Sequence, residues 1–344
     1  MTRENQRSSE ITASNVGYAE LVGAKCLSAK NILVTGASGF IGTSLIQLLC
    51  ESECRIVRLL RRPIKVWTEP NKARVQDFVC DLLDPVMWHS ILDGIDVVLH
   101  LAAQTSTYEA NRDPRSDLEK NVLPILLMLQ ACEERKLNPI VIFASTVTIC
   151  GAPEQLPVNE SHPDLPITVY DLHKQMAEQY LKYHTRIGTV RGASLRLANV
   201  YGPGPRSSQA DRGILNQMVG RALRGEALTV YGSGEQLRDY VYVDDVARAF
   251  VAAAVNADAI NGGHYIIGRG DGHSIAQALE LVAERVAMRT GKRAPIIRVA
   301  PPNGLSPIEG RNFISDSTRF SDVTGWRAHH ALSQGIDNLI ESLI

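Results

Sequence analysis

The segment Asn31-Ile-Leu-Val-Thr-Gly-Ala-Ser-Gly-Phe-Ile-Gly42 joins a short run of β-branched residues to a glycine-rich turn. The run has the pattern of a buried strand, and apolar residues at helical spacing follow from Phe40 to Cys50. Three glycines at this spacing allow a tight turn, a close approach of the backbone to a pyrophosphate, and close packing of the helix on the strand. The free N–H groups at the start of the helix would face the phosphates. We therefore predict a dinucleotide-binding loop, rather than a glycine-rich turn without a ligand, formed by Gly36, Ser38, Gly39, Phe40, Ile41 and Gly42.

Strand and helix patterns alternate on the C-terminal side of this segment. Apolar or alternating runs predict strands at Arg55–Leu60, Val75–Cys80, Asp96–Leu101, Pro139–Ala144 and Gly192–Ala198. Helical spacing predicts helices at Leu118–Arg135 and Tyr170–Thr185. Alternating units of this length are typical of an α/β fold with a Rossmann-type, doubly wound parallel sheet that helices cover on both faces.

The pattern changes after Tyr201, where Gly202-Pro-Gly-Pro205 predicts a turn. Shorter strands are predicted at 228–231, 240–243 and 264–268, and helices near 213–224, 245–255 and 274–290. We therefore divide the chain into three parts. These are a polar N-terminal extension at 1–28, a dinucleotide-binding domain at 29–200 to which a segment near 228–255 returns, and a smaller C-terminal α/β substrate-binding lobe that makes up most of 201–344.

The composition excludes several classes of protein. The 344 residues include 36 basic and 37 acidic side chains, so the net charge of −1 gives no general attraction to nucleic acid or to a membrane surface. No apolar run reaches the roughly 20 residues that cross a bilayer, and the polar N-terminus lacks the apolar core of a secretion signal. Six scattered cysteines without a CxxC pair indicate reduced thiols rather than disulfides or a metal site. We therefore expect a cytoplasmic protein that has no nucleic-acid, membrane or metal partner.

The end of the second predicted strand bears on the choice of dinucleotide. A carboxylate there binds the ribose hydroxyls of NAD, whereas an arginine accommodates the additional phosphate of NADP. The strand ends in Leu59-Leu-Arg-Arg62 without an acidic residue. Arg61 is the better placed arginine, because a guanidinium can stack on adenine and bind phosphate. The cofactor is thus NAD or NADP, and Arg61 and Arg62 favour NADP by a small margin, unless they are a solvated surface pair.

Two further strand ends are candidates for cofactor contacts. Asp81-Leu82 follows the third strand and either binds the adenine amino group or caps the helix that begins near Asp84-Pro85. His100 ends the fourth strand and is expected to be a structural hydrogen-bonding group. The residues that let the backbone approach the cofactor after this strand are Leu101, Ala102 and Ala103.

Candidate catalytic residues occur further along the chain. Tyr170-Asp-Leu-His-Lys174 opens a predicted helix and places Tyr170 and Lys174 on one face, since residues four apart are neighbours. A free phenol keeps its proton up to pH ~10, so a tyrosine base needs a nearby ammonium, which Lys174 supplies. Ser145 and Thr146 follow a strand at the edge where parallel sheets bind ligands, and they offer hydroxyls to a substrate oxygen. Such a helical pair is more often an exposed amphipathic pair, but its place downstream of a dinucleotide loop favours an active site.

These motifs occur together in one order and spacing. Along the chain they read ILVTGASGFIG, HLAAQ, FASTVTICG, YDLHK, SLRLANVYGPG, YGSGEQLRDYVYVDDVARA and DSTRFSDVTGW. From about residue 30 to residue 342 the sequence resembles the extended short-chain dehydrogenases/reductases of the NAD-dependent epimerase/dehydratase family. The resemblance implies an enzyme that acts on a nucleotide sugar with NAD or NADP. It also implies a homodimer in which the predicted helices 118–135 and 170–185 form a four-helix bundle with their copies.

The resemblance also assigns roles to single residues. Thr146 corresponds to the catalytic serine or threonine, Tyr170 to the general base and Lys174 to its partner. Asn121 corresponds to an asparagine that supports the active-site helix. The substrate-binding residues that the resemblance implies, the last three of them at the substrate diphosphate, are Ser145, Thr146, Asn199, Arg238 and Arg311. The alternatives are an ion pair of Arg238 with Asp239 or Asp244, and a turn capped by Asn199.

The departures from the family pattern narrow the chemistry. Sugar dehydratases carry Asp-Glu directly after the catalytic serine or threonine, and the nucleotide-sugar decarboxylases carry an acidic residue there. Here Val147-Thr148 follows Thr146, so neither elimination nor decarboxylation is supported. Cys150 and Ile266 replace a usual tyrosine and a usual asparagine, which puts details of the substrate pocket in doubt.

Three functions fit these residues. The first is a nucleotide-sugar epimerase, at C4 of the sugar, which oxidises its substrate to a keto-sugar and reduces it again on the other face. The second is a reductase of a nucleotide 4-keto-sugar that consumes NADPH. The third is a dinucleotide-binding protein without catalysis, against which the intact set of Thr146, Tyr170 and Lys174 argues. We favour the epimerase.

Overall fold

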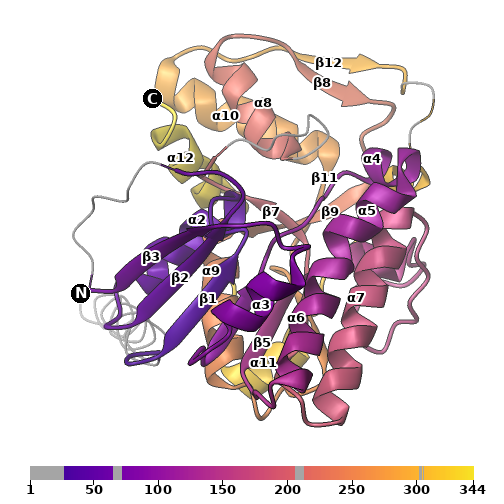
Figure 1. Ribbon diagram of the computed structural model, residues 1–344. Helices are drawn as coiled ribbons and strands as arrows, with labels where there is room; N and C mark the ends of the chain where they lie inside the picture. Colours follow the sequence, from indigo (N-terminus) through magenta and orange to yellow (C-terminus); the bar gives the residue numbers. More distant parts are fainter. Residues whose placement is uncertain (1–26, 65–71, 206–212, 302–303, 305) are drawn as a thin grey trace, which may run out of the picture.

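A computed structural model describes residues 27–64, 72–205, 213–301, 304 and 306–344 of the chain. At its centre is a seven-stranded parallel sheet in the order β3-β2-β1-β4-β5-β6-β10 (Figure 1). The strands are β1 (Asn31–Thr35), β2 (Arg55–Leu60), β3 (Arg74–Val79), β4 (Val97–His100), β5 (Ile140–Thr146), β6 (Arg191–Leu197) and β10 (His264–Ile267). The predicted Rossmann-type fold is therefore confirmed. The predicted extension at 1–28 lies almost wholly outside the described residues.

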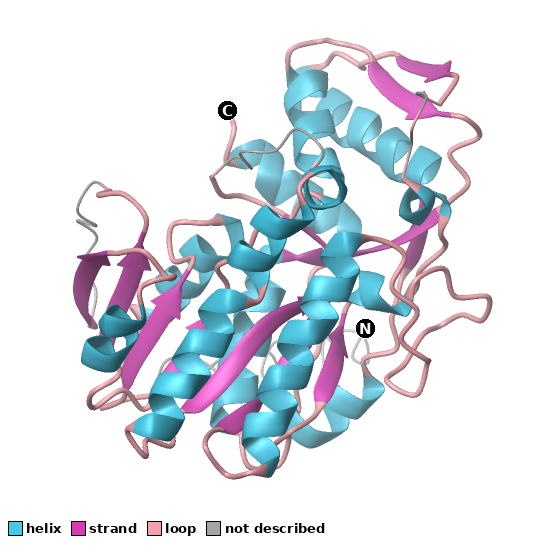
Figure 2. Cartoon of the chain, turned by 45° about the vertical axis from the view of Figure 1, so that its right-hand side comes forward, coloured by secondary structure: helices cyan, strands magenta, loops and turns pink. Residues whose placement is uncertain are grey.

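Helices cover both faces of this sheet (Figures 1 and 2). One face carries α2 (Phe40–Leu49) and α9 (Val243–Val255), and the other carries α3 (Pro85–Ile91), α5 (Pro114–Asn121), α6 (Leu123–Glu134) and α7 (Val169–Arg186). Ile32 and Val34 belong to the core formed with α2 and α9, whereas Leu33 belongs to the core formed with α6. Burial on both faces explains why the strands are almost continuously apolar. Among the described residues, none of the helices is both long and apolar enough to span a bilayer.

The single helix predicted at Leu118–Arg135 is wrong, because the structure divides this stretch into α5 and α6 at Val122. Pro124 stands in the first turn of α6. Proline has no N–H to donate, and its ring clashes with the carbonyl four residues earlier, so it fits the start of a helix and not its interior. Leu118, Val122 and Ile125 have the spacing of one continuous helix, which is why the pattern did not reveal the break.

A smaller lobe lies over the carboxyl ends of the strands (Figure 1). It contains a three-stranded sheet of β7 (Asn199–Tyr201), β9 (Leu237–Tyr242) and β11 (Gly272–Ser274), and a pair of β8 (Leu228–Tyr231) with β12 (Ile296–Val299). Three helices pack together in this lobe, namely α8 (Ile214–Leu223), α10 (Ile275–Thr290) and α12 (Leu332–Glu341). The remaining elements are α4 (Thr107–Arg112), α11 (Thr318–Thr324) and the 3₁₀ turns η1 (Val147–Cys150) and η2 (Pro307–Gly310).

The segment near 228–255, which we expected to return to the first domain, is divided between the two lobes. Its strand β8 pairs with β12 in the smaller lobe, whereas α9 packs against α2 beneath the large sheet. Apolar residues of α9 such as Val246 and Phe250 are fully buried in the core of that sheet. The chain then returns a second time as β10, which pairs with β6 and becomes the last strand.

Candidate active site

A cavity of about 1630 Å³ runs between the carboxyl ends of the parallel strands and the smaller lobe. Ligands of doubly wound sheets bind at this edge. Sixteen of the predicted site residues line the cavity, namely Gly36, Ser38, Gly39, Phe40, Ile41, Gly42, Arg61, Asp81, Leu82, Leu101, Ala102, Ala103, Ser145, Thr146, Tyr170 and Lys174. The structure therefore gathers the predicted cofactor loop and the predicted catalytic residues into one place, although they are up to 138 positions apart in the chain (174 − 36).

The glycine-rich turn has no room for side chains. A Cβ on Gly36, whose φ is +67°, would lie 2.7 Å from the backbone nitrogen of Ala102, and one on Gly42 would lie 2.2 Å from the carbonyl oxygen of Gly36. Helix α2 begins after Gly39 without any side-chain cap. The first N–H groups of a helix have no partner within it, so they remain available to an anion in the cavity. This bare, uncapped cradle fits the pyrophosphate of a dinucleotide.

Thr35 fixes the segment that faces this turn. Its hydroxyl oxygen accepts hydrogen bonds from the backbone N–H groups of Leu101 and Ala102, at 3.1 and 3.0 Å, and lies 3.2 Å from Nδ1 of His100. His100 is buried, and burial, reinforced by the charge of Lys174, lowers its pKa to about 3. The imidazole is thus neutral at physiological pH and serves to connect β1 with β4.

Tyr170 and Lys174 occupy the first turns of α7. Thr168 caps this helix: its hydroxyl accepts the N–H of Asp171 at 3.2 Å, and the Asp171 carboxylate accepts the N–H of Thr168 at 3.0 Å. Both functional side chains are buried, with 7% of Tyr170 and 2% of Lys174 exposed, so they are not a solvated amphipathic pair. Burial lowers the pKa of Lys174 to about 7, although the carboxylates of Glu178 and Asp117 oppose this change.

Two hydroxyl groups complete the reactive end of the cavity. The Thr146 hydroxyl lies 2.8 Å from that of Thr148 and accepts the N–H of Thr148 at 3.2 Å. The hydroxyl of Ser145 is buried and finds no hydrogen-bond partner among the described residues. A buried polar group without a partner is costly, so Ser145 is well suited to bind a polar group of a ligand in the cavity.

A buried polar network lies behind the site, and among its members only Asn121 was assigned a supporting role from the sequence. Asn121 donates to the carbonyl of Gln104 at 3.0 Å and to the carboxylate of Asp117 at 2.9 Å. Asp117 also accepts from the side chain of Gln104 and lies 2.7 Å from Nδ1 of His173 on α7. Gln104 itself lines the cavity. The signal in the sequence was the spacing of Asp117 and Asn121, which are four apart and are the two buried residues of α5.

Three predicted substrate residues do not line the cavity: Asn199, Arg238 and Arg311. The guanidinium of Arg238 is buried and donates to the backbone carbonyls of Leu237, Glu309 and Arg311. It also lies 3.7 Å from the carboxylate of Glu309.

The alternative partners that we considered for Arg238 are wrong, because both carboxylates are engaged elsewhere. Asp239 accepts the backbone N–H groups of Arg269, Gly270 and Ser315. Asp244 accepts the hydroxyl of Ser44 at 2.7 Å.

The wall formed by the smaller lobe was also missed. It consists of residues from α8 and from the end of the chain, including Asn216, Gln217, Arg221, Arg224, Leu339, Ser342 and Leu343. The sequence pattern had not predicted α12, and no local motif connects it with the cofactor loop. Only the packing of α12 on α8 brings this wall to the cavity.

Comparisons with known proteins show the family of the chain. The model of the NAD dependent epimerase/dehydratase family matches residues 32–268. Over 314 residues the chain is 28% identical to the UDP-glucose 4-epimerase of Mycolicibacterium smegmatis, covering 90% of this chain and 97% of that protein. It is 26% identical to a dTDP-4-dehydro-6-deoxyglucose reductase of Escherichia coli, over 91% of this chain and 97% of the other.

The structure is also similar to solved structures of such enzymes. The UDP-glucose 4-epimerase of Thermotoga maritima, solved with UDP-glucose, superposes with a TM-score of 0.79 at 29% identity, covering 91% of this chain and 98% of that one. The family model covers well over half of the 344 residues, including the glycine-rich turn and the catalytic helix. The chain is therefore an enzyme of the NAD dependent epimerase/dehydratase family.

Proposed function

We propose that the protein is a nucleotide-sugar epimerase that acts at C4 of the sugar by transient oxidation and reduction. The observation that carries this proposal is that Thr146, Tyr170 and Lys174 line the same cavity as the glycine-rich turn. The proposal is further supported by Val147 and Thr148, which stand where elimination would need acidic residues. The similarity to UDP-glucose 4-epimerases over almost the whole chain points in the same direction.

In this proposal each residue has one task. Tyr170 takes the proton of the sugar hydroxyl that is oxidised and returns it after reduction. The ammonium of Lys174 favours the phenolate form of Tyr170, because a nearby positive charge stabilises an anion. The hydroxyl of Thr146, with Ser145 beside it, holds the sugar oxygen in reach of Tyr170. The nicotinamide, when bound, accepts the hydride and gives it back.

The dinucleotide would be held by the turn from Gly36 to Gly42, by Asp81 and Leu82, and by the backbone of 101–103. Arg61 lines the cavity at the end of β2, where no carboxylate is present, whereas Arg62 does not line it. This arrangement favours NADP over NAD in our proposal. It also favours a second candidate function, an NADPH-dependent reductase of a nucleotide 4-keto-sugar.

A single screen separates these functions. The purified protein is incubated with a panel of nucleotide sugars, with and without added NADPH, and the products are separated by chromatography. An epimerase converts a substrate such as UDP-glucose without net consumption of dinucleotide, whereas a reductase oxidises stoichiometric NADPH as it reduces a nucleotide 4-keto-sugar included in the panel. No conversion of any nucleotide sugar under either condition would contradict both functions.

We also propose a homodimer that forms through α6 and α7 and acts in the cytoplasm. Leu172 and Tyr183 on α7 are 45% and 48% exposed and, eleven residues apart, lie on one side of the helix, where a second copy could cover them. The five described cysteines are all free thiols, as expected in a reducing compartment. A monomer by light scattering at micromolar concentration would contradict the dimer.

A further inference from the structure

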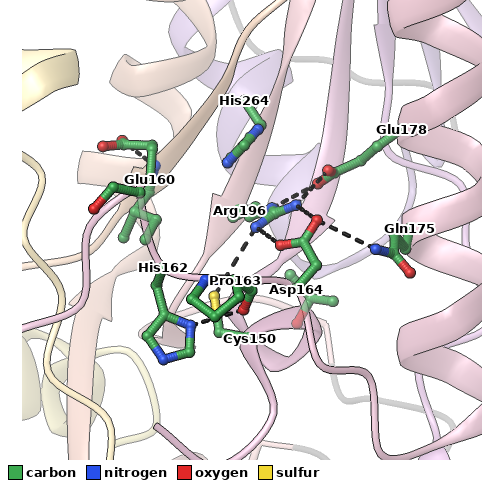
Figure 3. Close-up of polar contacts among 12 residues, drawn as sticks. Cys150, Glu160, His162, Pro163, Asp164, Gln175, Glu178, Arg196 and His264 are labelled. Atoms are coloured by element: carbon green, nitrogen blue, oxygen red, sulfur yellow. Dashed lines mark hydrogen bonds and ion pairs between the residues drawn. The ribbon is translucent and has the colours of Figure 1, made fainter. Parts of the chain in front are cut away.

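Arg196 on β6 has a fully buried side chain that forms two ion pairs (Figure 3). Its Nη1 and Nη2 donate to the two carboxylate oxygens of Asp164 at 2.6 and 2.9 Å. Its Nε and Nη2 donate to the two carboxylate oxygens of Glu178 at 3.0 and 2.7 Å. The guanidinium is thus shared between two carboxylates, each held by a pair of hydrogen bonds. Only arginine presents donors in a planar fork that suits this arrangement.

The two carboxylates belong to the segments that lead to the catalytic residues. Asp164 lies in the connection 151–168, which runs from the turn after Thr146 to the start of α7. Four residues further on, Thr168 caps that helix. Glu178 lies on α7 one turn beyond Lys174 and two turns beyond Tyr170, so that the three side chains share one face.

We propose that Arg196 is a positioning residue, which fastens the connection 151–168 and helix α7 to β6 so that Tyr170 and Lys174 face Thr146. This inference rests on the proposed function, in which these three residues perform the chemistry. Arg196 touches none of them in the described contacts and acts through Asp164 and Glu178.

The energetics of buried ion pairs favour a positioning role over a purely stabilising one. The cost of removing charges from water is so large that a buried ion pair is often no more stable than well-packed apolar residues of the same size. The geometric precision of such a pair is what apolar packing does not supply. Here two carboxylates share one guanidinium, which leaves an excess of one negative charge. The ammonium of Lys182, 3.8 Å from Glu178, offsets part of this excess. His264 beside it stays neutral, since burial and then the charges of Arg196 and Lys182 lower its pKa to about 4.

Glu178 connects this cluster with the proton on Lys174. The groups that face Lys174 are Glu178 on its own helix, Asp117 on α5, the neutral His100 on β4 and the ring of Phe143 on β5. Of these, Glu178 is the strongest support for the charged form of Lys174. Asp164 is not among the groups that act on Lys174. Removal of the Glu178 carboxylate should therefore lower the pKa of Lys174 further, whereas removal of the Asp164 carboxylate should not.

The test compares Asp164→Asn with Asp77→Asn in the full-length protein. The control removes a carboxylate from a second buried arginine of the same sheet, since Arg58 is 3% exposed and pairs with both oxygens of Asp77 at 2.7 and 2.8 Å. That pair joins β2 to β3 and does not touch the catalytic helix. Hydrogen exchange, kcat with UDP-glucose, and dinucleotide affinity are measured for both variants.

Asp164→Asn is expected to raise hydrogen exchange in 151–168 and in the first turn of α7. It should lower kcat about 10- to 100-fold, because a small displacement of reacting groups has effects of this size. The dinucleotide affinity should not change. Asp77→Asn should raise exchange only along β2 and β3 and leave kcat within about twofold. Glu178→Gln should in addition move the basic limb of the kcat–pH profile down by ~1 unit, since Lys174 then loses its proton more easily. Asp164→Asn should leave that limb in place.

The proposal is overturned if exchange in 151–168 is unchanged in Asp164→Asn, or if its kcat falls no further than that of Asp77→Asn. If the basic limb of the kcat–pH profile does not move in Glu178→Gln, the proposed effect of Glu178 on the proton of Lys174 is overturned. The exchange measurement needs no substrate. If the wild-type protein converts no nucleotide sugar, the proposed function fails, while the exchange data still decide whether Arg196 fastens this segment.

Discussion

The ammonium nitrogen of Lys174 lies 4.0 Å from the centroid of the Phe143 ring. The negative face of an aromatic ring attracts a cation, so this contact offsets a part of the cost of burying the charge. Burial nevertheless lowers the pKa of Lys174 to about 7. The lysine is therefore close to the midpoint between its charged and neutral forms at physiological pH, where small changes in its surroundings alter its charge.

This shift predicts a pH-dependent stability. Between pH 7 and about 10 the unfolded chain holds a proton on Lys174 that the folded protein has released, so the contribution of this group to the free energy of unfolding rises with pH. The melting temperature of the wild type should therefore rise relative to that of Lys174→Met when the pH is raised from 7 to 9.5. Calorimetry of both proteins at several pH values measures this difference, and a constant difference would contradict the buried, uncharged lysine.

Replacement of Tyr170 by Phe removes the ionisable oxygen and keeps the ring. Loss of a general acid–base typically costs about 10²- to 10⁴-fold in rate. We expect kcat to fall within this range, with the fold and the dinucleotide affinity retained, as measured by circular dichroism and titration. A Phe variant with turnover near that of the wild type would show that another residue is the base.

The choice of dinucleotide can be tested with two neighbouring arginines. If Arg61 holds the 2′-phosphate, Arg61→Ala should weaken NADP binding about ten- to hundred-fold, since a hydrogen bond to a charged group contributes roughly 1.5–3 kcal/mol, and should hardly affect NAD. Arg62→Ala is the matched control, because Arg62 is exposed and does not line the cavity. Equal losses for NAD and NADP, or tighter binding of NAD by the wild type, would refute the preference for NADP.

Arg238→Lys tests whether a buried arginine outside the cavity wall reaches the substrate. Lysine cannot replace the fork that now serves the carbonyls of Leu237, Glu309 and Arg311, so the melting temperature should fall by several degrees. If Arg238 also binds the substrate diphosphate, as the family resemblance implies, the KM of the nucleotide sugar should rise strongly at unchanged dinucleotide affinity. A lower melting temperature with an unchanged KM would leave Arg238 with a structural role alone.

The fold was predictable because its signals are local. The strand, the glycine-rich turn and the helix at 31–49 follow each other directly, and the two central strands β1 and β4 are nearly continuous apolar runs. The pairing of Tyr170 with Lys174 was predictable for the same reason, since both lie on one helix. The break at Val122 was not predicted, because Leu118, Val122 and Ile125 have the spacing of one continuous helix although α5 is mostly polar and α6 mostly apolar.

What the sequence could not supply are contacts made across the fold. Asp164, Glu178 and Arg196 meet from three different segments, and no local spacing connects the arginine with either carboxylate. Arg238 is a similar case, because two of its three backbone acceptors lie about 70 residues away and carry no side-chain signature. Adjacent charges in the sequence, such as Asp239, suggested the wrong partner because strand neighbours point to opposite faces.

The position of β10 has a consequence for the synthesis of the chain. The seven-stranded sheet and the core beneath it lack α9 and β10 until residue 267 has left the ribosome, although the six other strands emerge much earlier. Throughout that interval the hydrogen-bonding edge of β6 has no neighbour, and such edges pair readily with other chains. The seven-stranded sheet of this enzyme cannot be completed before nearly half of the segment 201–344 has been made, so aggregation of the nascent chain competes with folding chiefly in that interval.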